Sequence, residues 1–489
     1  MVLNRLTFCW LALVTIFLSD VSYSSVGRFR DVFNANMLLK SWRRKAEEQR
    51  VRLFDRLPQN IESKYTTPQV IANRGYTSET HHVTTDDGYI LEIHRIPPKG
   101  TAKKVVFLQH GVLQSSGTWL VNPSSRSLAI LLAEQSYDVW LGNFRGNKYS
   151  RKHATLNPNS DEYWKFSWDQ IGNYDIPSVI NYILKTTGQS KLSYVGHSLG
   201  CGVFFIAMIK HPDLNAKIEL MIALSPLSSF ANFNAIFRAL TPFTDPIENF
   251  LRLLRTRVFL DSEVAGDRLF DIACEQTYSQ ARFCREVFIL VCGPNRKNLD
   301  PALIPLMNAN FMTGTSVAVI AQFAQNYNAG ETFQAYDYGT EGNLQKYGST
   351  KPFEYDLTKI TAPIYVFSGA VDRIVTAKDV DWLLTKLRNL KGSTRFNEYN
   401  HLDFIWVGLT SALSVGMLWG SSCIPKSPTQ EAEDIQTKHC RDMNAEVVSV
   451  SSAVSNDKVP LLNRHMAESS IQTATSSKNN ALDDCVSFQ

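Results

Sequence analysis

The sequence lacks the patterns by which several classes of protein are recognised. It has no Cys-x-x-Cys pair and no histidine–cysteine group with metal-ligand spacing, so nothing in it indicates a metal site. Its formal net charge is only +4, which favours neither nucleic acid nor an acidic partner. It contains no Asn-x-Ser/Thr acceptor for N-glycosylation, which is unusual for a secreted enzyme of this size.

The sequence also lacks an apolar run long enough to span a bilayer, which takes about 20 residues. The first apolar run, residues 6–18, follows Arg5 and precedes a short serine-rich stretch. This pattern predicts a signal peptide in residues 1–25, cleaved between Val21 and Ser25, and hence a secreted, extracellular protein. An uncleaved anchor formed by residues 6–18 is the alternative. After cleavage we expect no transmembrane span.

The remaining composition is that of a globular protein. The chain has 489 residues, of which 44% are hydrophobic and 20% charged, enough for one large α/β domain. Residues 26–66 are basic and predict a solvated arm, with a propeptide or a membrane-surface helix as alternatives. Residues 421–489 are polar and poor in hydrophobic side chains, which predicts a disordered tail.

The most informative stretch is the pentapeptide Gly196-His-Ser198-Leu-Gly200. An apolar run at 191–195 predicts a buried strand before it, and a second run at 201–209 predicts a helix after it. Strand, G-x-S-x-G and helix are the parts of a nucleophile elbow, a turn so tight that the positions two residues before and two residues after the serine need glycine. Ser198 is therefore the candidate nucleophile.

Apolar strands and helices alternate around this elbow, which predicts an α/β fold with a mostly parallel sheet. We expect strands at residues 82–85, 89–94, 104–110, 138–142, 191–195, 217–224, 362–369 and 395–399, and helices at 169–187, 201–209 and 378–387. The alternation stops between residues 227 and 357, where helical patches at 230–240 and 316–327 predict an inserted helical cap. The expected core is then residues 67–226 and 358–420.

Two loops after the cap offer the partners that a serine nucleophile needs. Asp372 follows the expected strand at 362–369, and His401 follows the one at 395–399. Function in an open α/β sheet gathers at the carboxyl ends of strands, and the order Ser, Asp, His fits this architecture. The rival acids are less suitable, because Asp403 is too close in sequence to lie behind His401 and Asp379 falls within a helix.

The chemistry explains why all three residues are needed. A serine hydroxyl is a weak nucleophile until an imidazole removes its proton, and a carboxylate behind the imidazole fixes its tautomer. The oxyanion also needs two backbone N–H groups. We assign one to Leu199, directly after the nucleophile. The other comes from the loop after the strand at 104–110, at Val112, with Leu113 as the neighbouring option. His110 is expected to support this loop.

With these residues in place, the chain resembles the acid lipase family, which contains gastric and lysosomal acid lipases. The resemblance covers about residues 67–406. Its motifs include Asp86-Asp-Gly-Tyr89, Leu108-Gln-His-Gly111, Asp138-Val-Trp-Leu-Gly-Asn143, Phe166-Ser-Trp-Asp169, Gly196-His-Ser-Leu-Gly200 and His401-Leu-Asp-Phe404.

The resemblance implies an α/β-hydrolase with a cap. It implies hydrolysis of triacylglycerols or sterol esters at a lipid–water interface, without metal or organic cofactor. The family's triad corresponds to Ser198, Asp372 and His401. Cys274 and Cys284 resemble its cap disulfide, and Cys292 resembles its lone thiol.

The chain departs from the family at three points. Leu199 stands where the family usually has glutamine, so a side-chain contact is lost although the backbone N–H remains. The absent glycosylation sites argue against a lysosomal address, which is the alternative to secretion. After Trp406 the resemblance ends, and a helix at 409–419 is expected to be needed to hold His401. The main function hypothesis is a secreted serine lipase. The alternatives are a carboxylesterase for small esters and a catalytically impaired lipid-binding relative.

Overall fold

The computed structural model describes residues 61–102, 104–233, 258–261, 274, 277–295 and 297–407. The expected signal peptide, residues 26–60 of the basic arm, the expected helix at 409–419 and the tail at 421–489 lie outside the described residues. The arm residues that are described contain one 3₁₀ helix, Ile61–Lys64.

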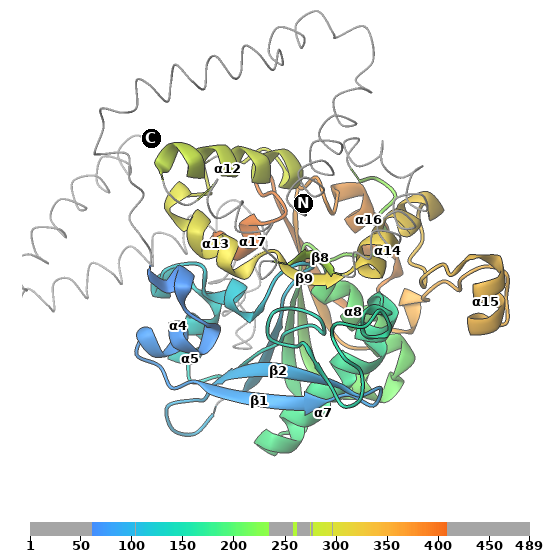
Figure 1. The fold of residues 1–489 in the computed structure, drawn as a ribbon, viewed down its shortest axis with the longest axis horizontal. Helices are drawn as coiled ribbons and strands as arrows, with labels where there is room; N and C mark the ends of the chain where they lie inside the picture. Colours follow the sequence, from blue (N-terminus) through green and yellow to red (C-terminus); the bar gives the residue numbers. More distant parts are fainter. Residues whose placement is uncertain are drawn as a thin grey trace, which may run out of the picture. The chain divides into compact units, whose positions relative to one another are not determined.

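A nine-stranded sheet forms the centre of the fold (Figure 1). Its strands are β1 (Glu79–Thr84), β2 (Tyr89–Ile96), β3 (Val105–Gln109), β4 (Asp138–Leu141), β5 (Lys152–His153), β6 (Leu192–His197), β7 (Ile218–Leu224), β10 (Ile364–Gly369) and β11 (Leu390–Phe396). The spatial order is β1-β2-β4-β3-β6-β7-β10-β11, with β5 paired to β2. From β4 to β11 all neighbours are parallel, whereas β1 and β2 are antiparallel. The predicted mostly parallel sheet is confirmed.

Helices accompany the strands. They are α4 (Thr67–Asn73), α5 (Leu128–Glu134), α6 (Trp168–Gln170), α7 (Ile176–Thr187), α8 (Leu199–Lys210), α16 (Ala377–Lys386) and α17 (Asp403–Trp406). Short 3₁₀ helices cover Ser116–Leu120, Ser124–Arg126, Glu162–Trp164, Pro212–Lys217 and Leu357–Lys359. In Figure 1, α5 lies to the left of the sheet and α8 to its right. The sheet is therefore flanked by helices, as an α/β fold requires.

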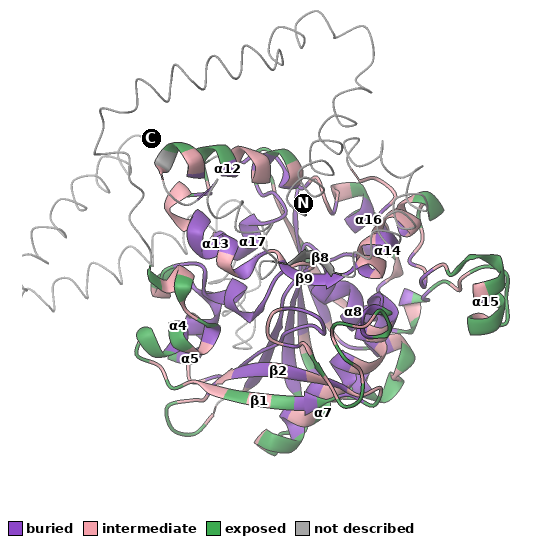
Figure 2. Cartoon of the chain, in the orientation of Figure 1, coloured by how far each residue is buried: buried purple, intermediate pink, exposed green. Residues whose placement is uncertain are grey.

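The elbow lies in the most buried part of the fold. All residues of β3 and β6 are buried, and so is α8 from Leu199 to Met208 (Figure 2). Parallel strands covered on both faces have this continuous apolar character. Burial of the strand and helix on either side of Ser198 gives the turn between them a rigid frame.

Two predicted elements differ from the structure by more than a shift of their ends. The helix expected at 169–187 is interrupted by a π-helical turn, Ile171–Asp175, where a Cβ on Gly172 would lie 2.5 Å from Ile206 Cγ2. This close contact between α8 and the turn needs a glycine. The strand expected at 395–399 was placed wrongly: β11 runs from Leu390 to Phe396 and none of its residues is fully buried. An edge strand that lacks an apolar pattern cannot be predicted from hydrophobic periodicity.

The chain between β7 and β10 contains a second group of elements. They are β8 (Val258–Asp261), α12 (Tyr278–Cys292), a 3₁₀ helix (Pro301–Leu303), α13 (Ile304–Asn310), β9 (Thr313–Ser316), α14 (Val317–Ala329) and α15 (Gly339–Tyr347). β8 and β9 pair antiparallel, and a disulfide joins Cys274 to Cys284. The helix expected at 316–327 is present as α14. In the helix expected at 230–240, residues 230–233 are not helical and 234–240 lie outside the described residues.

Candidate active site

Ser198 occupies the sharp turn between β6 and α8. Its backbone has φ 54° and ψ −118°, a conformation that costs a non-glycine residue free energy and that clusters at functional sites. A Cβ on Gly200 would lie 2.5 Å from the Gln109 carbonyl oxygen, and one on Gly196 would lie 3.0 Å from the Cys201 nitrogen. Both glycines are therefore required by close packing, as the sequence pattern predicted.

The structure brings the three expected triad residues together. His401 Nε2 lies 2.9 Å from Ser198 Oγ, and His401 Nδ1 lies 2.9 Å from Asp372 Oδ2. Asp372 follows β10, and His401 precedes α17. All three residues are at most 5% exposed, so these hydrogen bonds form in a site that excludes most water. The arrangement allows the imidazole to accept the serine proton while its other nitrogen donates to the carboxylate.

Asp372 is oriented by its own loop. Its Oδ1 accepts hydrogen bonds from the backbone N–H groups of Ile374 (2.8 Å) and Val375 (2.9 Å). Its Oδ2, which faces His401, also accepts a hydrogen bond from the hydroxyl of Ser225. Sequence reasoning missed Ser225. A signal was available, because Ser225 directly follows β7 at the same edge of the sheet as the triad loops.

The loop expected to supply an oxyanion donor lies against the elbow. A Cβ on Gly111 would lie 3.1 Å from Ser198 Cβ, so the backbone of the loop approaches the serine closely. Gly111 N–H donates to Gln114 Oε1 (3.0 Å), which fixes the turn that contains Val112 and Leu113. Leu113 has φ 61°, a left-handed conformation. Leu199, the other expected donor, begins α8, where backbone N–H groups point out of the helix.

His110 supports this loop. Its ring Nδ1 lies 2.7 Å from the Gly111 carbonyl oxygen, and its Nε2 accepts from the Phe144 N–H (3.3 Å). Nδ1 therefore carries the hydrogen. Burial lowers the pKa of His110 to about 4, so the ring stays neutral.

His197, directly before Ser198, is hydrogen bonded to the backbone of His401. Its Nε2 donates to the backbone carbonyl of His401 (2.9 Å). Its Nδ1 is buried and has no hydrogen-bond partner among the described residues. Burial, and then the neighbouring His401, lower the pKa of His197 to about 3. A ring that stays neutral keeps one donor aimed at the His401 backbone.

Because the imidazole of His197 is buried in its neutral form, it makes the stability of the protein depend on pH. In the unfolded chain His197 binds a proton below about pH 6.5, whereas in the folded protein it binds one only below about pH 3. Because the unfolded state binds more protons between these values, the free energy of unfolding falls as the pH falls. In His197→Gln this contribution is absent, while an amide donor remains. Between pH 6.5 and 4 the free energy of unfolding of the variant should fall less steeply, by about 1.4 kcal/mol per pH unit. Urea titrations at several pH values measure the two slopes, and equal slopes would contradict a neutral buried His197.

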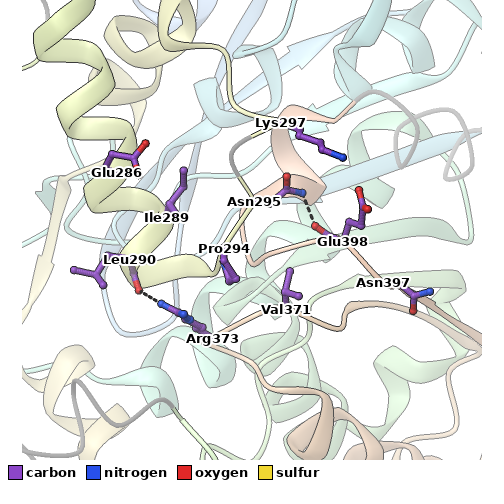
Figure 3. A pocket seen from close by; sticks show the side chains of 10 residues that line it. All are labelled: Glu286, Ile289, Leu290, Pro294, Asn295, Lys297, Val371, Arg373, Asn397 and Glu398. Carbon is purple, nitrogen blue, oxygen red and sulfur yellow. Dashed lines mark hydrogen bonds between the residues drawn. The ribbon is translucent and has the colours of Figure 1, made fainter. Parts of the chain in front are cut away.

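The end of α12 joins the acid loop to the base loop. The carbonyl oxygen of Cys292 accepts from the backbone N–H groups of both Arg373 and His401, each at 3.2 Å. Arg373 Nη1 also donates to the Leu290 carbonyl (3.2 Å), as Figure 3 shows at the wall of a cavity of about 690 Å³. Val371 and Arg373, on either side of Asp372, line this cavity. Arg373, which follows Asp372, and His401 itself are thus both bound to one helix terminus.

Gly293 permits this close approach. Its φ is +126°, and a Cβ there would lie 2.0 Å from the Val371 carbonyl oxygen. Asn400, directly before His401, donates from Nδ2 to the Gly293 carbonyl (3.1 Å). A side chain at position 293 would push the acid loop and the base loop apart.

Gly293→Ala should therefore lower kcat by about 10²-fold, because a displacement of about 1 Å within a catalytic group has an effect of this size. The matched control is Gly330→Ala. Gly330 also has a positive φ (+84°), but a Cβ there would meet no atom within 4 Å. Kinetics on a soluble ester, with the melting temperature of each variant, test this prediction. If the two variants lost equal activity, backbone strain rather than the contact with Val371 would be the cause.

Asp403, the rival acid, has a different place. Its Oδ2 accepts from the Asn400 N–H (2.6 Å) and from Asn295 Nδ2 (2.8 Å), and its Oδ1 accepts from Trp406 Nε1 (2.6 Å). Burial raises the pKa of its carboxyl to about 6, against the effect of these hydrogen bonds. Asp403 thus organises the loop around His401, whose imidazole is hydrogen bonded to Asp372 and Ser198 instead. Asp379, the other rival, lies in α16 and accepts from Ser229, Asn232 and Thr376.

The three cysteines expected in this part of the chain are found as the resemblance implied. Cys274 and Cys284 form a disulfide, and Cys292 is a buried free thiol. Within the described residues, no three His, Cys, Asp or Glu side chains are grouped so that they could hold a metal ion.

Comparisons with known proteins agree with this geometry. The family described as "partial alpha/beta-hydrolase lipase region" matches residues 67–123, and "alpha/beta hydrolase fold" matches residues 104–407. Lipase lipl-1 of Caenorhabditis elegans is 37% identical over 358 residues, which are 71% of this chain and 88% of that protein. Gastric triacylglycerol lipase of Bos taurus is 38% identical over 370 residues (72% and 89%). Lipase 1 of Drosophila melanogaster is 35% identical over 380 residues (76% and 83%).

The sheet, the elbow and the family match define an α/β-hydrolase. Within that class, the chain belongs to the lipase family that contains the gastric lipases, and the resemblance stated from the sequence is confirmed. The protein is therefore a carboxylic ester hydrolase that acts on lipid esters.

Proposed function

We propose that this protein is a secreted serine lipase that hydrolyses neutral lipid esters through an acyl-enzyme intermediate. Ser198 is the nucleophile, His401 the general base and Asp372 the acid that orients it. The observation that carries the proposal is the chain of two hydrogen bonds, each 2.9 Å, from Ser198 through His401 to Asp372. The elbow raises the serine to the end of this chain, at the carboxyl edge of the sheet.

The geometry indicates the order of events. His401 Nε2 removes the proton of Ser198 as Oγ attacks the ester carbonyl carbon, while the Nδ1–H remains bonded to Asp372. The N–H groups of Leu199 and Val112 stabilise the oxyanion of the tetrahedral intermediate. The imidazolium then protonates the leaving alcohol, and the acyl group stays on Ser198. Water, activated by the same imidazole, releases the fatty acid.

The substrate proposal rests on the apolar residues beside the elbow and on the relatives' names. The chain that follows β7 passes close to Ser198, because the Leu227 N–H donates to the Ser198 carbonyl (3.2 Å). It continues through Phe230 and Phe233, whose stacked rings have centroids 4.3 Å apart. This segment opens the proposed cap, residues 227–357, over the core formed by 67–226 and 358–420. Aromatic side chains in this segment would suit a long acyl chain, and the bovine relative is named a triacylglycerol lipase. Triacylglycerols and sterol esters are therefore the proposed substrates.

A chain-length series tests the substrate proposal. The full-length protein is given p-nitrophenyl esters from acetate to palmitate, and triolein and cholesteryl oleate as emulsions. A lipase for neutral lipids should prefer long chains and release fatty acid from an emulsion. Highest activity on acetate with none on emulsions would favour the small-ester carboxylesterase, and binding without hydrolysis would favour the impaired lipid-binding relative.

Secretion is the second part of the proposal. The expected signal peptide at residues 1–25 and the Cys274–Cys284 disulfide both suit an oxidising compartment, and a lysosomal destination is the alternative. None of the helices in the described residues is long and apolar enough to cross a membrane. The N-terminal residue of the mature protein, taken from both the culture medium and the cell membranes, tests the proposal. A start between residues 22 and 26 supports cleavage, whereas an intact N-terminus supports the anchor at residues 6–18.

A further inference from the structure

We propose that Ser225 is a fourth member of the site, a positioning residue that fixes the Asp372 carboxylate relative to the His401 imidazole. The inference rests on the proposed function, since it assigns a role within the Ser198–His401–Asp372 system. The Ser225 hydroxyl donates a hydrogen bond to Asp372 Oδ2, and its oxygen lies 3.1 Å from His401 Nδ1. The same two atoms, Oδ2 and Nδ1, form the acid–base contact of the triad.

The backbone at Ser225 is held in an unusual conformation that aims this hydroxyl. Ser225 directly follows β7 and has φ 47°, one of five positive φ values at non-glycine positions among the described residues. Its N–H donates to the Phe367 carbonyl on β10 (2.8 Å), so its backbone is tied to the strand that carries the acid loop. Ser225 is 1% exposed. A left-handed serine costs free energy, and such strain is found where function fixes a side chain.

The hydroxyl completes the hydrogen bonding of the acid. Asp372 Oδ1 already accepts two backbone N–H groups, and these leave Oδ2 as the atom that meets His401. With Ser225 as a second donor to Oδ2, the carboxylate is held at both oxygens and cannot rotate away from the imidazole. The Ser225 oxygen also offers the His401 Nδ1–H a second acceptor, which keeps Nε2 directed at Ser198.

The same loop supplies a matched control. Ser228, three residues further on, is also fully buried, but its hydroxyl has no hydrogen-bond partner among the described residues. Ser228→Ala therefore removes a buried hydroxyl from the same loop and leaves the triad untouched. Ser225→Gly is a second test variant, because it lacks the hydroxyl yet accommodates the positive φ without strain.

The experiment compares Ser225→Ala, Ser225→Gly and Ser228→Ala with the wild-type full-length protein, using a soluble short-chain p-nitrophenyl ester. Loss of a hydrogen bond to a charged group should lower kcat by about 10- to 100-fold in both Ser225 variants. KM should stay within about two-fold, because the hydroxyl contacts no substrate. The melting temperatures should match that of Ser228→Ala. A fall in kcat confined to Ser225→Ala would assign the effect to backbone strain and overturn the proposal, as would wild-type kcat in both.

A spectroscopic readout separates failure of this inference from failure of the proposed function. The proton on His401 Nδ1, shared with Asp372, should give a downfield proton resonance in the resting protein, whether or not an ester is hydrolysed. Its assignment follows from its loss in His401→Gln. In both Ser225 variants the chemical shift of this resonance should change and its proton should exchange faster with water, and both should stay unchanged in Ser228→Ala. An unchanged resonance in the Ser225 variants would overturn the positioning role even if the wild-type protein cleaved no ester.

Discussion

Ser198→Ala should reduce ester hydrolysis by about 10⁶-fold in kcat, to near the background rate. Removal of the nucleophile or of its base has effects of this order in serine hydrolases. His401→Ala should fall to the same level, because the serine at the end of a hydrogen bond of 2.9 Å to Nε2 is inert without that base. The double variant should be no worse than either single one, since the two residues act as a unit.

Initial rates on a short-chain p-nitrophenyl ester, at enzyme concentrations high enough to see the residual rate, measure these effects. Ser228→Ala is the control, because it removes a buried serine hydroxyl outside the triad and should keep nearly wild-type activity. If Ser198→Ala kept a hundredth or more of the wild-type activity, another residue would have to be the nucleophile.

Asp372→Asn should be the second most damaging change, with a loss of about 10⁴-fold in kcat. An asparagine keeps the shape of the side chain but can present an amide to His401 Nδ1, and the imidazole then takes the wrong tautomer. The two backbone hydrogen bonds to Oδ1, from Ile374 and Val375, can persist, so the loop should stay folded. A large loss of activity with little change in melting temperature is the expected combination.

Asp403→Asn separates the catalytic acid from its rival. Asp403 accepts hydrogen bonds from Asn400, from Trp406 in α17 and from Asn295 after α12, and an amide can replace only some of them. This variant should melt at a lower temperature and lose less than about 10²-fold in kcat, through small displacements of His401. Activity lost equally in Asp372→Asn and Asp403→Asn would mean that the acid has been chosen wrongly.

The sequence predicts the parts of the site in which chemistry dictates residue type. Close backbone contacts favour glycine at positions 196 and 200 of the elbow, and the strand and helix on either side are apolar because they are buried. Asp372 and His401 follow from a topological rule, since loops at the carboxyl ends of parallel strands lie along one edge. The structure brings these three side chains together in the expected order.

The remaining contacts could not be read from the sequence because they depend on tertiary distances. Nothing in the stretch around Gly293 indicates that its backbone touches the acid loop, and Ser225 is only one serine among several after β7. β11 was misplaced because an edge strand with Lys391, Gly392 and Ser393 has no apolar period. The π-helical turn before α7 packs Gly172 closely against Ile206, a contact that no periodicity shows.

Several contacts hold His401 within the described residues, and the helix expected at 409–419 stays a prediction. The sequence suggested that a helix at 409–419, outside the described residues, is needed to hold this histidine. The structure places other supports around it. Its backbone N–H is bound to the Cys292 carbonyl and its carbonyl to His197, and its imidazole is bound to Asp372 and Ser198. These supports come from α12, from the elbow and from the acid loop, all before residue 407.

The central claim is that Ser198 is an activated nucleophile in the full-length chain. Its most direct test is reaction of the intact protein with a fluorophosphonate, followed by proteolysis and mass mapping of the modified peptide. The account predicts one adduct, on Ser198, absent from His401→Ala because an unactivated serine does not react. An intact protein that acquired no adduct, or acquired it on another serine, would contradict the account.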